Sequence, residues 1–127
     1  MIYPGTLLTC NDNSGALTVK CIGIWNSSQR RGAPAGTTII VTVKTCLKGT
    51  SKVQRGSIHY ALITRTRQIY SRCTSTGDFL RFSENSVVLV SRKNNYLPVG
   101  TRVLGPIARE VWKRTFIRVV LLSAGVF

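Results

Sequence analysis

Asp12 and Ser14 are the first residues whose types could do chemistry, because a carboxylate beside a hydroxyl is part of many nucleophilic sites. They lie in Asp12-Asn13-Ser14-Gly15-Ala16, which is typical of a tight turn, since Asp and Asn hydrogen-bond nearby backbone and Gly accepts positive φ. A hydrolytic triad also needs a base, and His59 is the only histidine. We therefore expect no catalysis here, but a turn whose backbone N–H groups could meet a phosphate.

The four cysteines are the next candidates: Cys10, Cys21, Cys46 and Cys73. No C-x-x-C pair occurs, and His59 has no partner at the spacing of zinc ligands. A disulfide framework is conceivable, but nothing else in the sequence indicates an oxidising compartment. We expect four thiols, no metal and no cofactor.

Arg30 and Arg31 give the clearest binding signal, in a polar loop that covers residues 27–36. The alternative interpretation is a solvated hairpin loop. Two adjacent guanidinium groups repel each other in open solvent and match phosphate oxygens well, so anion contact explains them better. Four cations in and just before the connection at 47–56 make a similar but less specific case: Lys44, Lys48, Lys52 and Arg55.

The charge of the whole chain favours a polyanionic partner. The 127 residues carry 18 Lys and Arg against 4 Asp and Glu, a formal charge of +14, and no acidic residue occurs between Asp12 and Asp78. Nucleic acid is the first candidate and an acidic membrane surface the second. The apolar runs at 37–43 and 119–127 are far shorter than the ~20 residues of a spanning helix. Ten cations in the acid-free interval are the candidates for binding: Lys20, Arg30, Arg31, Lys44, Lys48, Lys52, Arg55, Arg65, Arg67 and Arg72.

Short strands with a period of two must position these residues. Apolar and polar side chains alternate at 17–22, 39–44 and 58–65, and shorter strands are expected at 79–82 and 87–90. Turns are expected at 74–77 and 83–86. This spacing predicts a mainly β fold in which antiparallel strands close into a small barrel. We expect a single domain that spans residues 1–127.

Helix is scarce and is predicted only near the C-terminus. Gly105-Pro106 introduces a short helix at 106–113, because Pro suits the first helical turn. Glu110 precedes Arg114 in the favourable i,i+4 order. The segment 115–122 is then expected to be a final strand or a buried extended segment.

A set of motifs occurs in order along the whole chain. The most specific are Gly100-Thr101-Arg102, Gly105-Pro106 and Arg109-Glu110. They are supported by Asp12-Asn13-Ser14-Gly15-Ala16, Cys21-Ile22, Ala61-Leu62-Ile63, Arg65-Thr66, Phe82, Glu84-Asn85 and Val88-Leu89. With these motifs the chain resembles the universal fourteenth protein of the large ribosomal subunit in its bacterial and organellar form.

The resemblance implies a five-stranded antiparallel barrel with short C-terminal helices, the helical segment at about 105–114, and no catalysis. It implies binding to large-subunit rRNA at the face that meets the small subunit, with contacts to neighbouring large-subunit proteins and to small-subunit rRNA. A ribosome-silencing factor that blocks subunit joining is a further implied partner. The residues expected at this interface are Thr101, Arg102, Arg109 and Lys113.

Departures from the family pattern favour a mitochondrial ribosome, with the bacterial cytoplasmic ribosome as the alternative. Thr37 and Thr76 stand where the family usually has Asp, Thr64 replaces an aliphatic residue, and Tyr96 and Trp112 are unusual in their segments. Residues 1–4 lead directly into strand-like sequence, without the features of a signal or transit peptide.

Two other classes of protein remain open at this point. A secreted ribonuclease would suit a small basic chain with four cysteines, but acid–base cleavage needs two titrating groups and His59 stands alone. Four free thiols would exclude such a disulfide-stapled enzyme. A free regulatory RNA-binding module would be expected to expose aromatic side chains for stacking, whereas most aromatics here fall on core positions of the predicted strands.

Overall fold

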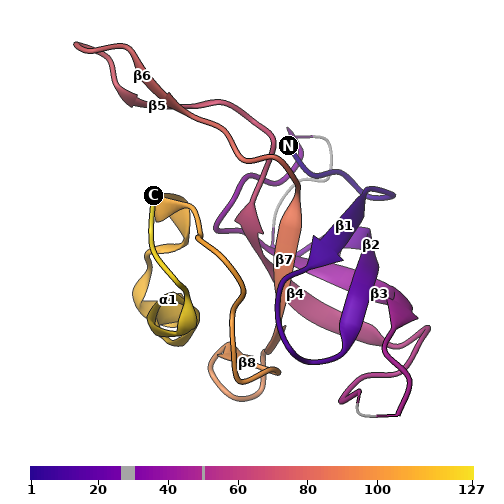
Figure 1. Ribbon diagram of the computed structural model, residues 1–127. Coiled ribbons are helices and arrows are strands. Elements are labelled where there is room, and N and C mark those ends of the chain that lie inside the picture. Colours follow the sequence, from indigo (N-terminus) through magenta and orange to yellow (C-terminus); the bar gives the residue numbers. More distant parts are fainter. Residues whose placement is uncertain (27–30, 50) are drawn as a thin grey trace.

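A computed structural model describes residues 1–26, 31–49 and 51–127 (Figure 1). The strands are β1 (Leu7–Cys10), β2 (Ala16–Ile24), β3 (Thr38–Cys46), β4 (Ile58–Arg65), β5 (Tyr70–Cys73), β6 (Asp78–Leu80), β7 (Ser86–Ser91) and β8 (Leu97–Pro98). Two 3₁₀ helices, η2 (Arg109–Val111) and η3 (Arg114–Phe116), precede the helix α1 (Ile117–Leu122). The predicted strands at 17–22, 39–44, 58–65 and 87–90 are confirmed, with wider bounds for three of them.

A closed barrel of five strands forms the body of the molecule. The strand order is β1-β2-β3-β4-β7, and β1 also pairs with β7, which closes the ring. The four pairings along this order are antiparallel, but the closing pairing is parallel, with Thr9 opposite Ser86 and Cys10 opposite Val87. The predicted barrel of antiparallel strands is therefore confirmed, and only the contact that closes it is parallel. Directions can alternate all round a ring only if the number of strands is even, so five strands require one parallel contact.

The interior of the barrel holds the first of two hydrophobic cores. The inward residues of β3 and β4, among them Ile39, Val41, Ala61 and Ile63, are fully buried there. Their alternation with less buried neighbours on β3 is the period of two that the sequence shows. The side chains of this core fill the interior of the barrel and exclude water from it.

A second core lies outside the barrel, between the strand pair β4–β7 and the chain after β8, residues 99–127, which we call the C-terminal segment. Leu62, Val88 and Val90 point to this side, and they pack with buried residues of the segment: Val103, Ile107, Val111, Phe116, Val119 and Val120. The strands β4 and β7 are therefore apolar on both faces over most of their length. The C-terminal segment covers one side of the barrel (Figure 1).

The predicted helix at 106–113 is wrong. The chain is extended at Ile107, which forms a bridge with Val126, and only residues 109–111 turn, as η2. The backbone N–H groups of Ile107, Ala108 and Arg109 donate to carbonyl oxygens of Gly125, Thr64 and Phe127, each at 2.9 Å. The Ile107 carbonyl, which a helix would pair with the Val111 N–H, instead accepts from the Phe127 N–H at 3.0 Å, so a bond to the last residues replaces the local helical bond.

The predicted extended segment at 115–122 is also wrong, because it contains η3 and α1. The buried residues Phe116, Val119 and Val120 are spaced by three and four, which is the helical period, and they face the second core. Arg114 does not pair with Glu110, whose carboxylate instead binds Arg72.

The hairpin of β5 and β6 projects away from the barrel, as Figure 1 shows. The expected turn at 74–77 is confirmed at its tip. The expected strand at 79–82 is shorter and begins earlier, as β6. Phe79, at 70% exposure, extends from the hairpin into solvent.

Gly36 gives a test of how tightly the C-terminal segment is docked. Its φ is +82°, and a Cβ at this position would collide with the carbonyl oxygen of Glu110. Gly56 has the same φ but open space around it, so it is the matched control. We expect Gly56→Ala to lower the free energy of unfolding by about 1–2 kcal/mol through backbone strain alone. Gly36→Ala should cost about 1–3 kcal/mol more, measured by urea denaturation. If both variants lose the same free energy of unfolding, the C-terminal segment can move away from a Cβ at position 36, and it is not tightly docked there.

Candidate nucleic-acid interface

The Asp12–Ala16 turn is built around a buried carboxylate. Asp12 accepts hydrogen bonds from the Ser14 hydroxyl at 2.5 Å, the Ser14 N–H at 3.2 Å and the Leu89 N–H at 3.1 Å. The Asp12–Ser14 pair thus ties the turn to β7, and both side chains are buried. His59 lies beside Ser57, with 2.8 Å between Nε2 and Oγ, and burial lowers its pKa. The hydroxyl nearest to this imidazole therefore belongs to Ser57 and not to Ser14.

All four cysteines are free thiols, as expected. Their environments differ: burial raises the pKa of Cys10, whereas hydrogen bonds from Ser75 and Thr76 lower the pKa of Cys73, on the hairpin, to about 6. Free thiols contradict the disulfide-stapled ribonuclease. No cluster of three or more His, Cys, Asp or Glu side chains occurs in the described ranges. No helix in these ranges is long and apolar enough to cross a membrane.

Three of the four carboxylates serve the fold. Asp12 is buried in its turn, Glu84 pairs with Arg65 at 3.0 Å, and Glu110 pairs with Arg72. Asp78 lies at the hairpin, where it accepts from the Thr76 hydroxyl at 2.8 Å. Over the part of the chain that the structure describes, these two ion pairs are the only ones between side chains. The other described cations therefore keep an uncompensated charge at the surface.

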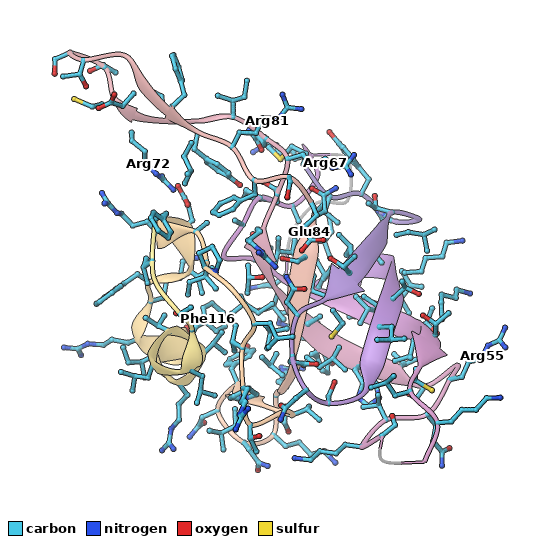
Figure 2. All side chains as sticks on the ribbon, in the orientation of Figure 1. Arg55, Arg67, Arg72, Arg81, Glu84 and Phe116 are labelled. Atoms are coloured by element: carbon cyan, nitrogen blue, oxygen red, sulfur yellow. The ribbon has the colours of Figure 1, made fainter. Side chains whose placement is uncertain are left out.

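Arg65 and Arg72, two of the ten candidates, are held inside these structural contacts. Arg65 is 14% exposed and donates from Nε to the Ser86 hydroxyl at 2.8 Å, besides its pair with Glu84. Arg72 binds both carboxylate oxygens of Glu110 and donates to the Phe127 carbonyl at 2.8 Å. Figure 2 shows Arg72 between the hairpin and the C-terminal segment. Less of their charge is available to a phosphate than that of an unpaired cation.

The end of β3 and the connection between β3 and β4 present a group of exposed cations: Lys44, on β3, and Lys48, Lys52 and Arg55, in the connection. We call this group the basic loop. The backbone N–H groups of Leu47 and Lys52 donate to the carbonyls of Gly15 and Ser14, each at 2.8 Å, so the loop is docked on the Asp12–Ala16 turn. A Cβ at Gly15 would collide with Ser51. Glycine in the turn therefore allows the close approach that holds the cations in place.

A second cationic group lies at the base of the hairpin. Arg67 and Arg81 line an open groove of about 340 Å³ with Phe82 and Ser83, and both guanidinium groups are near this base in Figure 2. Arg67 donates from Nε to the Ser83 carbonyl at 2.9 Å, which orients it. The sequence reasoning missed Arg81 because it lies beyond Asp78, outside the acid-free interval.

The remaining candidates are separate from these groups. Lys20 lies half-buried on β2. Arg31 is exposed before Gly32, and its neighbour Arg30 lies outside the described residues.

The four residues expected at the intersubunit face divide into two pairs. Thr101 and Arg102 are held by Asn13, whose Oδ1 accepts from their N–H groups at 2.7 and 3.0 Å. The Lys113 ammonium donates instead to the Gly36 carbonyl at 3.2 Å, and the Arg109 N–H to Phe127 at 2.9 Å. A groove of about 430 Å³ lies beside the first pair and is lined by Leu97, Pro98, Thr101, Arg118, Leu121 and Leu122. The sequence reasoning missed Arg118 and Leu121, because it expected no helix there.

Exposed cations on docked loops, with three of the four carboxylates held inside the fold, define a class: a small, strongly basic β-barrel protein with a cationic surface. The family model for ribosomal protein L14p/L23e matches residues 1–127, which is the whole chain, and the chain belongs to this family. It is a structural, non-enzymatic constituent of the large ribosomal subunit, in a family that binds rRNA and other ribosomal proteins. The resemblance to this family is thereby confirmed.

The Arg72–Glu110 pair predicts a dependence of stability on pH. The hydrogen bonds from Arg72 lower the pKa of Glu110 below its ordinary value of 4.5 in the folded protein. The stability that the pair contributes is therefore complete above about 4.5 and is lost as the pH falls through the lower, folded-state pKa. We expect Glu110→Gln to cost about 1–2 kcal/mol at pH 7 and to lose less stability than the wild type on acidification. Denaturant unfolding from pH 7 to pH 3 measures both.

Asp78→Asn is the control for this prediction, because Asp78 is an exposed carboxylate outside both ion pairs. This variant should change stability by at most about 0.5 kcal/mol. Parallel pH curves for the wild type and Glu110→Gln would contradict the role of the pair.

Proposed function

We propose that the chain binds large-subunit rRNA through its basic loop and the base of its hairpin, and meets the small subunit with its C-terminal face. This face is the surface that carries Thr101, Arg102, Arg109, Lys113 and the groove lined by β8 and α1. The observation that supports this is the division of charge: three of the four carboxylates are used inside the fold, while cations outside the two ion pairs are exposed at the end of β3, in the connection to β4 and at the base of the hairpin. Phosphate contacts of this kind supply affinity and orientation without reading sequence.

The candidate residues have two roles in this proposal. Exposed cations contact phosphates: Arg31, Lys44, Lys48, Lys52, Arg55 and Arg67, with Arg81 added. Arg65 and Arg72 act mainly by positioning the hairpin against the barrel and the C-terminal segment. Lys20, half-buried, and Arg30, outside the described residues, stay candidates on the sequence argument alone.

The basic loop gives the test of rRNA binding. Lys48 and Arg55 are exposed, so their replacement should spare the fold. Each phosphate contact releases condensed counterions from the RNA on binding, and a variant that lacks the contact releases fewer. We therefore expect Lys48→Ala with Arg55→Ala to reduce the slope of log affinity against log salt by roughly 2. The measurement is binding of a large-subunit rRNA fragment across a salt series, with thermal melting as the folding control.

Arg114→Ala with Arg118→Ala is the matched variant, since it removes the same charge from exposed positions near the opposite, C-terminal face. Its slope should stay close to that of the wild type. If both double variants lower the slope equally, binding follows net charge and the basic loop has no special role. If neither lowers it, the contacts lie elsewhere.

The C-terminal face is proposed to meet small-subunit rRNA, neighbouring large-subunit proteins and a ribosome-silencing factor. Its groove combines apolar side chains from β8 and α1 with the cation Arg118, and Leu121 is 76% exposed beside them. Such a mixture of an apolar patch and a charged rim is typical of a protein-binding surface. Thr101 lines this groove and Arg102 follows it in the chain, whereas Arg109 and Lys113 lie on the other part of the segment.

Charge reversal separates the two parts of this face. We expect Arg102→Glu with Arg118→Glu to weaken subunit joining or silencing-factor binding at least tenfold, while the protein still assembles into the large subunit. Arg109→Glu, on the other part, should have a much smaller effect. Sedimentation of reconstituted subunits measures joining, and pull-down with large subunits measures the factor. The reverse ranking would assign the interface to the part that carries Arg109 and Lys113.

We further infer a mitochondrial ribosome, with a bacterial ribosome as the alternative. The inference depends on the departures from the family pattern at Thr37, Thr64, Thr76, Tyr96 and Trp112. Recovery of the chain with large subunits from purified mitochondria is the expected result. Recovery only with cytoplasmic bacterial ribosomes would contradict it.

A further inference from the structure

Trp25, Tyr60 and Arg92 form a cluster at the edge of the second core, against which Tyr60 packs. The rings of Trp25 and Tyr60 meet edge to face, with centroids 5.6 Å apart and planes at 88°. The guanidinium carbon of Arg92 lies 3.9 Å from the centre of the Trp25 ring and 5.9 Å from that of Tyr60. We call these three residues the aromatic cluster.

The barrel brings the cluster together from three distant segments. Tyr60 lies on β4 opposite Ile40 of β3 and Val90 of β7. Arg92 follows Val90 by two residues, which returns its side chain to the same face. Trp25 directly follows β2, and its N–H donates to the Thr38 carbonyl at 3.1 Å. The rings are thus held by the sheet, while Arg92 is exposed.

The charge of Arg92 has no carboxylate to balance it. Glu84 and Glu110 are used by Arg65 and Arg72, Asp12 is buried in its turn, and Asp78 lies on the hairpin. A guanidinium stacked on an indole is already oriented, so little further ordering is needed when it meets an anion or a planar group.

An open cavity of about 240 Å³ is lined by Tyr60 and Arg92 of the cluster, while Trp25 lies behind Arg92 and does not line it. Ile58, Tyr60, Val90 and Val99 supply apolar surface, and Arg92 and Lys93 supply cations beside it. No carboxylate lines this cavity. The site therefore offers an apolar and aromatic surface to a flat group and positive charge to an anion attached to it.

We propose that the aromatic cluster and its cavity bind one unstacked base of rRNA, with Lys93 on the adjoining phosphate. This inference rests on the proposed binding of rRNA and adds to it a contact with a base. Bases displayed by loops and bulges stack on aromatic rings and on the guanidinium plane of arginine, which are the groups present here. A phosphate contact alone would need neither Trp25 nor Tyr60.

A fluorescence titration tests the stacking. The chain has two tryptophans, and Trp112 is 61% exposed on another segment, so Trp112→Phe leaves Trp25 as the only reporter. The probes are a ten-nucleotide oligoadenylate and an abasic ribose-phosphate polymer of equal length and charge. We expect oligoadenylate to quench Trp25 and to bind roughly tenfold more tightly than the abasic polymer, because one stacked base supplies this difference.

Two variants assign the preference to the cluster. Arg92→Lys keeps the charge and removes the planar guanidinium, so the preference for oligoadenylate should fall below about twofold. Lys93→Ala should weaken binding of both polymers alike and keep the preference, because it removes a charge and no stacking surface. Thermal melting verifies that both variants fold.

The outcomes distinguish this inference from the proposed function. Equal binding of the two polymers, weakened by salt, would overturn base stacking and leave rRNA phosphate binding intact. Failure to bind either polymer would count against both. If the preference is absent and Arg92→Lys instead releases a neighbouring protein from isolated large subunits, the cluster is a protein contact and the inference is wrong.

Discussion

Burial of β4 and β7 on both faces is the constraint on which the rest of the structure depends. Ala61 and Ile63 face the barrel, whereas Leu62, Val88 and Val90 face the C-terminal segment. A strand pair that is apolar on both sides exposes a large hydrophobic surface unless something covers it. The segment after β8 provides this cover, and its irregular path follows from the need to fill that surface while its backbone bonds to Thr64 and to the last residues. The barrel and the C-terminal segment therefore depend on the same two strands for their packing.

The scarcity of carboxylates connects this fold to its function. Glu84 and Glu110 stabilise the places where the hairpin leaves the barrel and where it meets the C-terminal segment, and Asp12 joins its turn to β7. A protein of charge +14 repels itself, and anionic partners relieve this repulsion. Placing the acids at structural junctions keeps the loops cationic, which suits a component of a ribonucleoprotein particle.

The Asp12–Ala16 turn determines where the cations of the basic loop lie. The basic loop rests on the Asp12–Ala16 turn through two backbone hydrogen bonds, and Gly15 leaves room for Ser51. A short motif that resembles a catalytic pair thus acts as a platform for a distant loop. The two contacts that dock this loop on the turn are between backbone groups, which leaves Lys48 and Arg55 available to a ligand, whereas the Lys52 ammonium also donates to the Val99 carbonyl at 3.5 Å.

The sequence by itself determined β2, β3, β4 and β7, the barrel class, the family and the excess of positive charge, because these follow from local periodicity, from motifs or from composition. It predicted no bounds for β1, β5 or β8. It could predict the turn at Asp12–Ala16 from the preferences of Asp, Asn and Gly. It failed at residues 106–122, where Gly105-Pro106 predicts a helix and the structure places an extended chain before α1. Only the tertiary structure decided the parallel closure, the pairing of Glu110 with Arg72 and the meeting of Trp25, Tyr60 and Arg92. These contacts join residues far apart in the chain, and their free energy comes from partners that no local pattern can identify.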